Sequence, residues 1–115
     1  TLIMIGVRSG TPRAVNLAGD WMAAISRAAY LASTEIACEK GAFPLFDRDR
    51  HLQRPHIAAL DADVREAIAR HGIRNGCLTS IAPTGTISLF AGNISSGIEP
   101  VFDFRVRRRI LDASG

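Results

Sequence analysis

The stretch "IAPTGTIS", residues 81–88, places an apolar pair before a proline, then Thr84-Gly85-Thr86, then apolar residues again. This order is typical of a strand that turns into a helix. The first turn of a helix has backbone N–H groups without internal acceptors, and Gly85 lacks a Cβ that would keep an oxygen away from them. The stretch therefore fits either a plain turn with a helix cap or a phosphate-binding corner, and the bare pattern favours the plain turn.

A long helix is the clearest element elsewhere in the chain. It is predicted from Asp20, whose carboxylate would cap the amino end, to Gly41, which suits a left-handed terminating position. Six apolar residues recur at helical spacing and predict one buried stripe: Trp21, Ile25, Ala28, Ala29, Ala32 and Ile36.

The other segments are shorter. Residues 42–55, with two prolines and mixed charge, are predicted as an irregular connection. "DADVREAIARHG" at 61–72 predicts a second helix, with Asp63 and Glu66 as a variant capping box. A third helix is predicted at the "GTISLFAGN" segment. Three short apolar segments are predicted as strands, at residues 2–7, 77–82 and 101–106.

The composition is that of a globular chain with a mild basic bias. Its 115 residues are 47% hydrophobic and 22% charged, with a net charge of +3, which fits one small domain or a piece of a larger one. "RVRRR" at 105–109 is expected to be a solvated strand edge rather than a nucleic-acid contact. No apolar run reaches 18 residues and no signal-peptide pattern occurs, so no membrane partner is expected.

The two cysteines and three histidines form no recognisable chemical motif. Cys38 and Cys77 are far apart and outside any CxxC, which favours a reducing, cytoplasmic location and two small buried residues. The histidines show neither HxxxH nor HExxH spacing, so no metal site is predicted.

Two longer stretches carry a family resemblance. "GIRNGCLTSIAPTGTISLFAGNISSGIEPVFDFRVRRRIL" and the earlier "AAYLASTEIACEKGAFPLFD" resemble the carboxy-terminal part of the catalytic barrel domain of ribonucleotide reductases, above all the adenosylcobalamin (B12)-dependent class II branch. The resemblance covers about residues 17–112, and the paired "PTGT" and "SSGIEP" motifs are its specific part. Within "SSGIEP", Ser95, Ser96 and Gly97 are expected to form a turn near the site, with Glu99 held by local hydrogen bonds.

The resemblance implies a fold of the mixed α/β class. The chain would be a fragment of a ten-stranded α/β barrel, with residues 1–115 forming a single partial domain. A small α+β unit that folds on its own is the alternative. An isolated barrel segment would expose apolar edges, which predicts self-association into a homo-oligomer.

The resemblance also implies a function in DNA precursor synthesis. The family reduces ribonucleotides to deoxyribonucleotides through a thiyl radical, and the parent enzyme of this branch uses adenosylcobalamin. By resemblance, the substrate's phosphates would be bound by Thr84, Gly85, Thr86, Ile87 and Ser88.

The radical chemistry has no counterpart in these residues. The Asn-x-Cys-x-Glu motif of the radical cysteine is absent, as is the terminal CxxC that accepts electrons, so no catalytic residue is assigned. The chain is therefore expected to bind ribonucleotide with the remainder of the reductase chain as its partner, and not to turn over substrate alone. The alternative is a non-catalytic phosphate-binding or protein-interaction module derived from the family.

Overall fold

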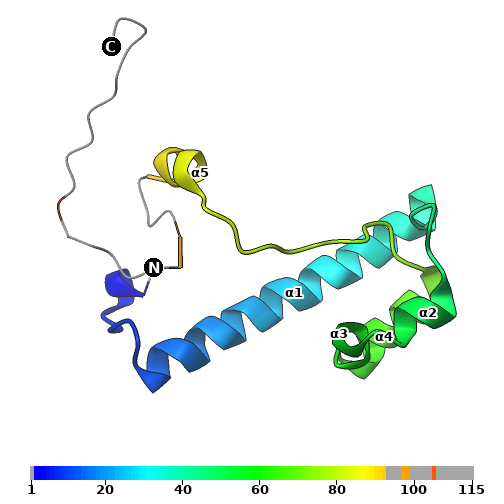
Figure 1. Cartoon of the computed structure of the whole chain (residues 1–115), viewed down its shortest axis with the longest axis horizontal. Coiled ribbons are helices and arrows are strands. Elements are labelled where there is room, and N and C mark those ends of the chain that lie inside the picture. The colour runs from blue at the N-terminus through cyan, green and yellow to red at the C-terminus, as the bar shows by residue number, and fades with distance from the viewer. Residues whose placement is uncertain (1, 93–96, 99–104, 106–115) are drawn as a thin grey trace, which may run out of the picture. The chain divides into compact units, whose positions relative to one another are not determined.

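A computed structural model of the chain describes residues 2–92, 97–98 and 105 (Figure 1). The chain divides into two compact units. One is formed by residues 10–80, and the other by residues 1–9 together with residues 81–115.

The predicted mixed α/β class is wrong for the described part of the chain, which is helical and contains no strand. The predicted strand at 2–7 is instead a short 3-10 helix, η1 (Ile3–Ile5), ended by Gly6 at a φ of 71°. Residues 77–82 have no regular secondary structure, and the predicted strand at 101–106 lies outside the described residues except for Arg105. A strand is stabilised by hydrogen bonds to a neighbouring strand, and no described segment supplies such a neighbour. The β-branched composition of these segments was therefore not sufficient to predict strands.

The long helix α1 (Pro12–Lys40) begins earlier than predicted and ends where predicted. The Thr11 hydroxyl caps it by accepting a hydrogen bond from the backbone N–H of Ala14 at 3.3 Å, and Pro12 occupies the first helical position. Asp20 therefore lies within the helix and is not its cap. Gly41 ends the helix at a φ of 77°, as expected of a terminating glycine.

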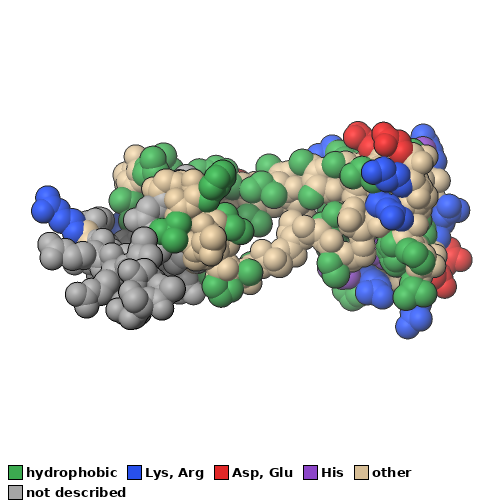
Figure 2. Space-filling model, turned by 90° about the horizontal axis from the view of Figure 1, so that it is seen from above, with side chains coloured by type: hydrophobic (Ala, Val, Ile, Leu, Met, Phe, Trp, Pro, Cys, Tyr) green, Lys and Arg blue, Asp and Glu red, His purple; other side chains and the backbone are tan. Residues whose placement is uncertain are grey.

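The predicted apolar stripe of α1 is solvent-exposed in this chain. Trp21, Ile25 and Ile36 are 37%, 54% and 38% exposed. The buried residues nearest the carboxyl end are Ser33, Thr34 and Ala37, which fall on a different side of a helix that turns 100° per residue. In Figure 2, hydrophobic side chains are visible along the exposed length of α1. The periodicity marks an apolar face of α1, but that face is not the one that packs on the core, so the predicted burial is wrong.

Three further helices complete the unit of residues 10–80: α2 (Arg48–Leu52), α3 (Pro55–Ala58) and α4 (Ala62–His71). Their buried core consists of Ile57, Val64, Ile68 and Ile73, against which Tyr30 and Leu31 of α1 also pack. α1 contacts α4, and α2 contacts both α3 and α4. Val64 and Ile68 are the buried residues of α4, and the connection predicted as irregular at 42–55 contains α2.

The start of α4 differs from the predicted capping box. The helix follows Asp61, whose side chain makes no cap hydrogen bond. Asp63 instead accepts two hydrogen bonds from the Arg27 guanidinium of α1, at 3.1 and 2.6 Å, and Glu66 accepts one from Arg70 at 2.8 Å. Gly72, the last residue of the segment predicted as helical, ends α4 at a φ of 75°.

Candidate functional site

The "PTGT" segment leads into α5 (Gly85–Phe90), a helix close to the one predicted there (Figure 1). Thr84 precedes the first helical residue, and its side chain makes no cap hydrogen bond. The helix ends at Ala91, and Gly92 follows in the left-handed region with a φ of 80°. The five predicted phosphate-binding residues are therefore consecutive positions of one helix start.

Ser88 stabilises the first turn of α5 through two hydrogen bonds. Its backbone N–H donates to the Thr84 carbonyl oxygen at 2.6 Å, and its hydroxyl donates to the Gly85 carbonyl oxygen at 3.1 Å. The side chain is 3% exposed. Both Ser88 donors are thus used within the turn, so this residue holds the corner together and does not present a free hydroxyl.

The other residues of the predicted phosphate-binding corner, Thr84–Ser88, are accessible to solvent to different degrees. Gly85 and Thr86 are exposed, Ile87 is 67% exposed, and Thr84 is half-buried. A Cβ built on Gly85 would meet no atom within 4 Å, and its φ is not in the left-handed region. The space beside Gly85 is therefore free for a ligand, and the backbone there does not itself require glycine.

The corner carries no charge of its own. Residues 81–92 include no acidic, basic or histidine side chain. An anion there would be met by backbone N–H groups of the first turn and by threonine hydroxyls, which are neutral donors.

Most of the second predicted motif, "SSGIEP", lies outside the described residues. Of the residues expected to form its turn, Gly97 is described and half-buried, whereas Ser95, Ser96 and Glu99 are not described.

The two cysteines are exposed, against the expectation that both are buried. Cys38 lies on the outer side of α1, and Cys77 lies in the extended segment that follows α4. Within the described ranges, no group of three or more histidine, cysteine or acidic side chains could hold a metal ion. The same ranges contain no helix with the length and apolar character needed to cross a bilayer.

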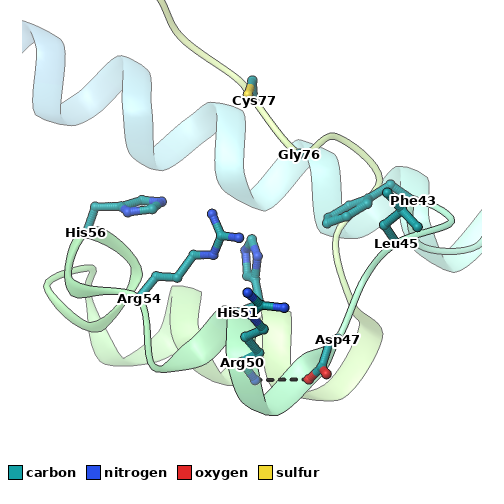
Figure 3. Close-up of a pocket in the computed structure, with 9 residues that line it drawn as sticks. All are labelled: Phe43, Leu45, Asp47, Arg50, His51, Arg54, His56, Gly76 and Cys77. Atoms are coloured by element: carbon teal, nitrogen blue, oxygen red, sulfur yellow. Dashed lines mark hydrogen bonds between the residues drawn. The ribbon is translucent and has the colours of Figure 1, made fainter.

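The site that sequence reasoning missed is a pocket of about 390 Å³ in the unit of residues 10–80 (Figure 3). Its lining comes from two separate stretches of the chain, residues 43–56 and residues 76–77. No sequence motif joins these stretches, which is why the pattern gave no signal for it.

The whole chain matches a known domain family. Residues 1–114 match the model of "Ribonucleotide reductase, barrel domain". No solved structure is a significant match.

Curated relatives agree with that match. A vitamin B12-dependent ribonucleoside-diphosphate reductase of Mycobacterium tuberculosis is 40% identical over 96% of this chain and 13% of its own length. One of the same name from Thermoplasma acidophilum is 32% identical over 96% of this chain and 12% of its own length. A ribonucleoside-diphosphate reductase subunit alpha of Treponema pallidum is 35% identical over 67% of this chain and 10% of its own length.

The chain thus spans only about an eighth of the length of the B12-dependent relatives that it matches. The resemblance noted from the "PTGT" and "SSGIEP" motifs is confirmed by the family match over nearly every residue. The chain belongs to the ribonucleotide reductase family and represents a stretch of its barrel domain.

Proposed function

We propose that this chain is the substrate-phosphate-binding segment of a B12-dependent ribonucleoside-diphosphate reductase, the enzyme class named for its relatives. The observation that carries the proposal is the open helix start at Thr84–Ser88, which lies inside a family match covering residues 1–114. In the parent enzyme, the segment would serve the reduction of ribonucleotides to DNA precursors.

The corner would bind the phosphates through neutral donors. The first-turn N–H groups of Gly85, Thr86 and Ile87 have no helical acceptor, and the Thr84 and Thr86 hydroxyls add two more donors. Each hydrogen bond to a charged group contributes about 1.5–3 kcal/mol. Ser88 would act indirectly, since its two hydrogen bonds fix the turn that directs these donors outward.

The corner would bind and position substrate, and it would not perform the redox step. No Asn-x-Cys-x-Glu motif occurs in the chain, so no residue is proposed as the thiyl radical site. Mixing the chain alone with ribonucleotide, adenosylcobalamin and a dithiol should therefore yield no deoxyribonucleotide.

Cobalamin binding is not assigned to the described residues. The pocket of residues 43–56 and 76–77 measures about 390 Å³, which is far too small for a corrin ring with its nucleotide tail, and arginine and histidine side chains form much of its wall. The residues do not fit the cofactor, and its place would be elsewhere in the parent enzyme.

The exposed face of α1 would contact the remainder of the reductase chain. Val15, Met22 and Ile25 are 65%, 48% and 54% exposed and lie on one side of the helix. Apolar area of this kind is normally covered in a folded domain, and the parent chain is several times longer than this one. The cytoplasm is the proposed location.

Calorimetric titration tests the binding claim with a matched pair of ligands. A nucleoside diphosphate should bind the chain saturably, whereas the same nucleoside without phosphates should not, because the proposed contacts are all to phosphate oxygens. Equal heats from the two ligands would contradict the proposal.

A further inference from the structure

The pocket of residues 43–56 and 76–77 has the size of a small-molecule site. Its volume of about 390 Å³ falls within the usual range of roughly 300–1,000 Å³. The lining residues come from α2, the start of α3 and the extended segments beside them (Figure 3): Phe43, Leu45, Asp47, Arg50, His51, Arg54, His56, Gly76 and Cys77.

Three basic side chains converge on this pocket. In Figure 3, the Arg54 guanidinium and the His56 ring are turned toward the His51 imidazole, and Arg50 also lines the pocket. Within the described part of the chain, neither Arg50 nor Arg54 forms an ion pair, since the ion pairs there join Arg27 and Arg70 to acidic residues elsewhere. Two guanidinium groups therefore face the pocket with their donors available.

The one acidic residue of the lining is already engaged. The Asp47 carboxylate caps α2 by accepting a hydrogen bond from the backbone N–H of Arg50 at 3.0 Å. In Figure 3 this carboxylate is directed toward the amino end of α2. Its single negative charge is outnumbered by the charges of the two arginines, so the pocket keeps an excess of positive charge.

His51 supplies an independent indication that a partner is missing. Its side chain is 7% exposed, and its Nε2 atom is buried with no hydrogen-bond partner among the described residues. A buried polar atom without a partner is costly, and most such atoms in folded proteins are satisfied. The ring packs against Phe46 and Phe43, with centroids 5.3 and 6.1 Å away, which fixes its orientation in the wall.

The charges around His51 identify the kind of partner that would suit it. Burial first, and then the positive charges of Arg54 and His56, hold the pKa of the His51 imidazole below its ordinary value. The imidazole is therefore neutral near pH 7, and an added oxyanion would both relieve the repulsion among these groups and offer them an acceptor.

The other wall of the pocket is apolar. Leu45 is 90% exposed and the Phe43 ring is half-buried. Gly76 leaves the ring edge accessible, since a Cβ built there would lie 3.9 Å from two Phe43 ring carbons. A ligand in this pocket would thus meet cationic donors at one end and an aromatic and aliphatic surface at the other.

We propose that this pocket binds a small phosphate monoester, with the phosphate on Arg50 and Arg54 and an apolar or aromatic body against Phe43 and Leu45. Phosphate suits the two guanidinium groups because each can donate parallel N–H bonds to a pair of phosphate oxygens. The site lies in residues 10–80 and shares no residue with the Thr84–Ser88 corner, so it does not depend on the proposed substrate role.

Nuclear magnetic resonance titration of the chain with phenyl phosphate tests this site. Saturable shifts of the His51 ring signals are expected, with an affinity at least about tenfold higher than for inorganic phosphate or benzyl alcohol, since each of these offers only half of the contacts. If benzyl alcohol binds as tightly as phenyl phosphate, the pocket does not recognise the phosphate group. If inorganic phosphate binds as tightly as phenyl phosphate, the pocket does not recognise an apolar body. Either result would overturn the proposal.

Three arginine variants locate the contact. Arg54→Gln and Arg50→Gln should each weaken phenyl phosphate binding at least about tenfold, whereas Arg65→Gln, an exposed arginine of α4 outside the pocket, should leave it unchanged. All three side chains are exposed, so circular dichroism should show unchanged folding. Wild-type affinity in both pocket variants would refute the proposal, as would an equal loss in Arg65→Gln.

One further variant separates this site from the substrate corner. Gly85→Val should not affect phenyl phosphate binding, whatever it does to nucleoside diphosphate binding. A loss of phenyl phosphate binding in Gly85→Val would move the binding site to the corner and contradict the pocket.

Discussion

The Ser33 hydroxyl and Asn75 exchange two hydrogen bonds, each 3.0 Å long. Ser33 Oγ donates to the Asn75 side-chain oxygen and accepts from the Asn75 backbone N–H. The Ser33 carbonyl oxygen also accepts from the Arg74 N–H at 3.1 Å. These contacts fasten the segment that follows α4 to the side of α1, 42 residues away in sequence. Ser33, which is 1% exposed, is therefore a packing and hydrogen-bonding residue of the core rather than a surface serine.

Ser33→Ala should destabilise the chain because it removes both bonds and leaves the Asn75 N–H without its acceptor. A loss of about 1–3 kcal/mol in the free energy of unfolding is expected. Urea denaturation followed by circular dichroism measures it. Ser80→Ala, at an exposed serine, is the matched control and should change stability by less than about 0.5 kcal/mol. Equal stability of the two variants would show that the Ser33 bonds contribute nothing.

The Arg27–Asp63 pair should make stability depend on pH. The hydrogen bond from Arg27, together with its positive charge, holds the pKa of the Asp63 carboxyl below its ordinary value, against a smaller opposing effect of desolvation. The unfolded chain then binds more protons than the folded chain near the lowered pKa, so the stabilisation is present above about pH 4 and is lost as the pH falls further.

Asp63→Asn isolates this contribution. The wild type should be more stable than the variant at pH 7, and the gap should close progressively below about pH 4 in thermal denaturation. Asp20→Asn, at an exposed position elsewhere on α1, is the matched control for the loss of one negative charge. A gap for Asp63→Asn that persists undiminished at pH 2 would mean that the charge of Asp63 is not its source.

The exposed apolar face of α1 should cause the chain to self-associate when it is studied alone. Ile25→Glu places a charge on that face, which also includes Met22 and Val15, and should shift the chain toward monomer in analytical ultracentrifugation. Ala58→Glu adds the same charge on α3, away from this face, and should leave the association unchanged. Identical sedimentation of wild type and Ile25→Glu at high concentration would contradict the assignment of the face.

The sequence predicts the helices best where their ends carry specific residues. Gly41 and Gly72 have positive φ angles of 77° and 75° at the predicted helix ends, which a glycine tolerates because it has no Cβ. The predicted start of α1 at Asp20 is wrong, because Thr11-Pro12 is itself a recognised pair for a helix start and begins the helix earlier. α2 was missed because five residues are too few to show a helical period, and its cap Asp47 was the only local signal.

The sequence does not show which segments of the chain pack against one another. The period of Trp21, Ile25 and Ile36 marks an apolar face, but a period does not say what covers that face. The strand predictions at residues 2–7 and 77–82 failed for the same reason, since a strand depends on a neighbour that no described segment provides. The corner at Thr84–Gly85 was found because its residues are consecutive, whereas the pocket of His51 and Arg54 depends on chain segments that only the fold brings together.

The most direct test of the phosphate corner is calorimetry with a nucleoside diphosphate on Gly85→Val and on its matched control Gly19→Val. A Cβ at either glycine meets no atom of the chain within 4 Å, and neither residue has a positive φ, so both variants should fold. The added side chain at Gly85 should occupy the space that the phosphate needs and lower the affinity at least about tenfold, whereas Gly19→Val should bind like the wild type. Undiminished binding by Gly85→Val would contradict the assignment of Thr84–Ser88 as the substrate-phosphate site.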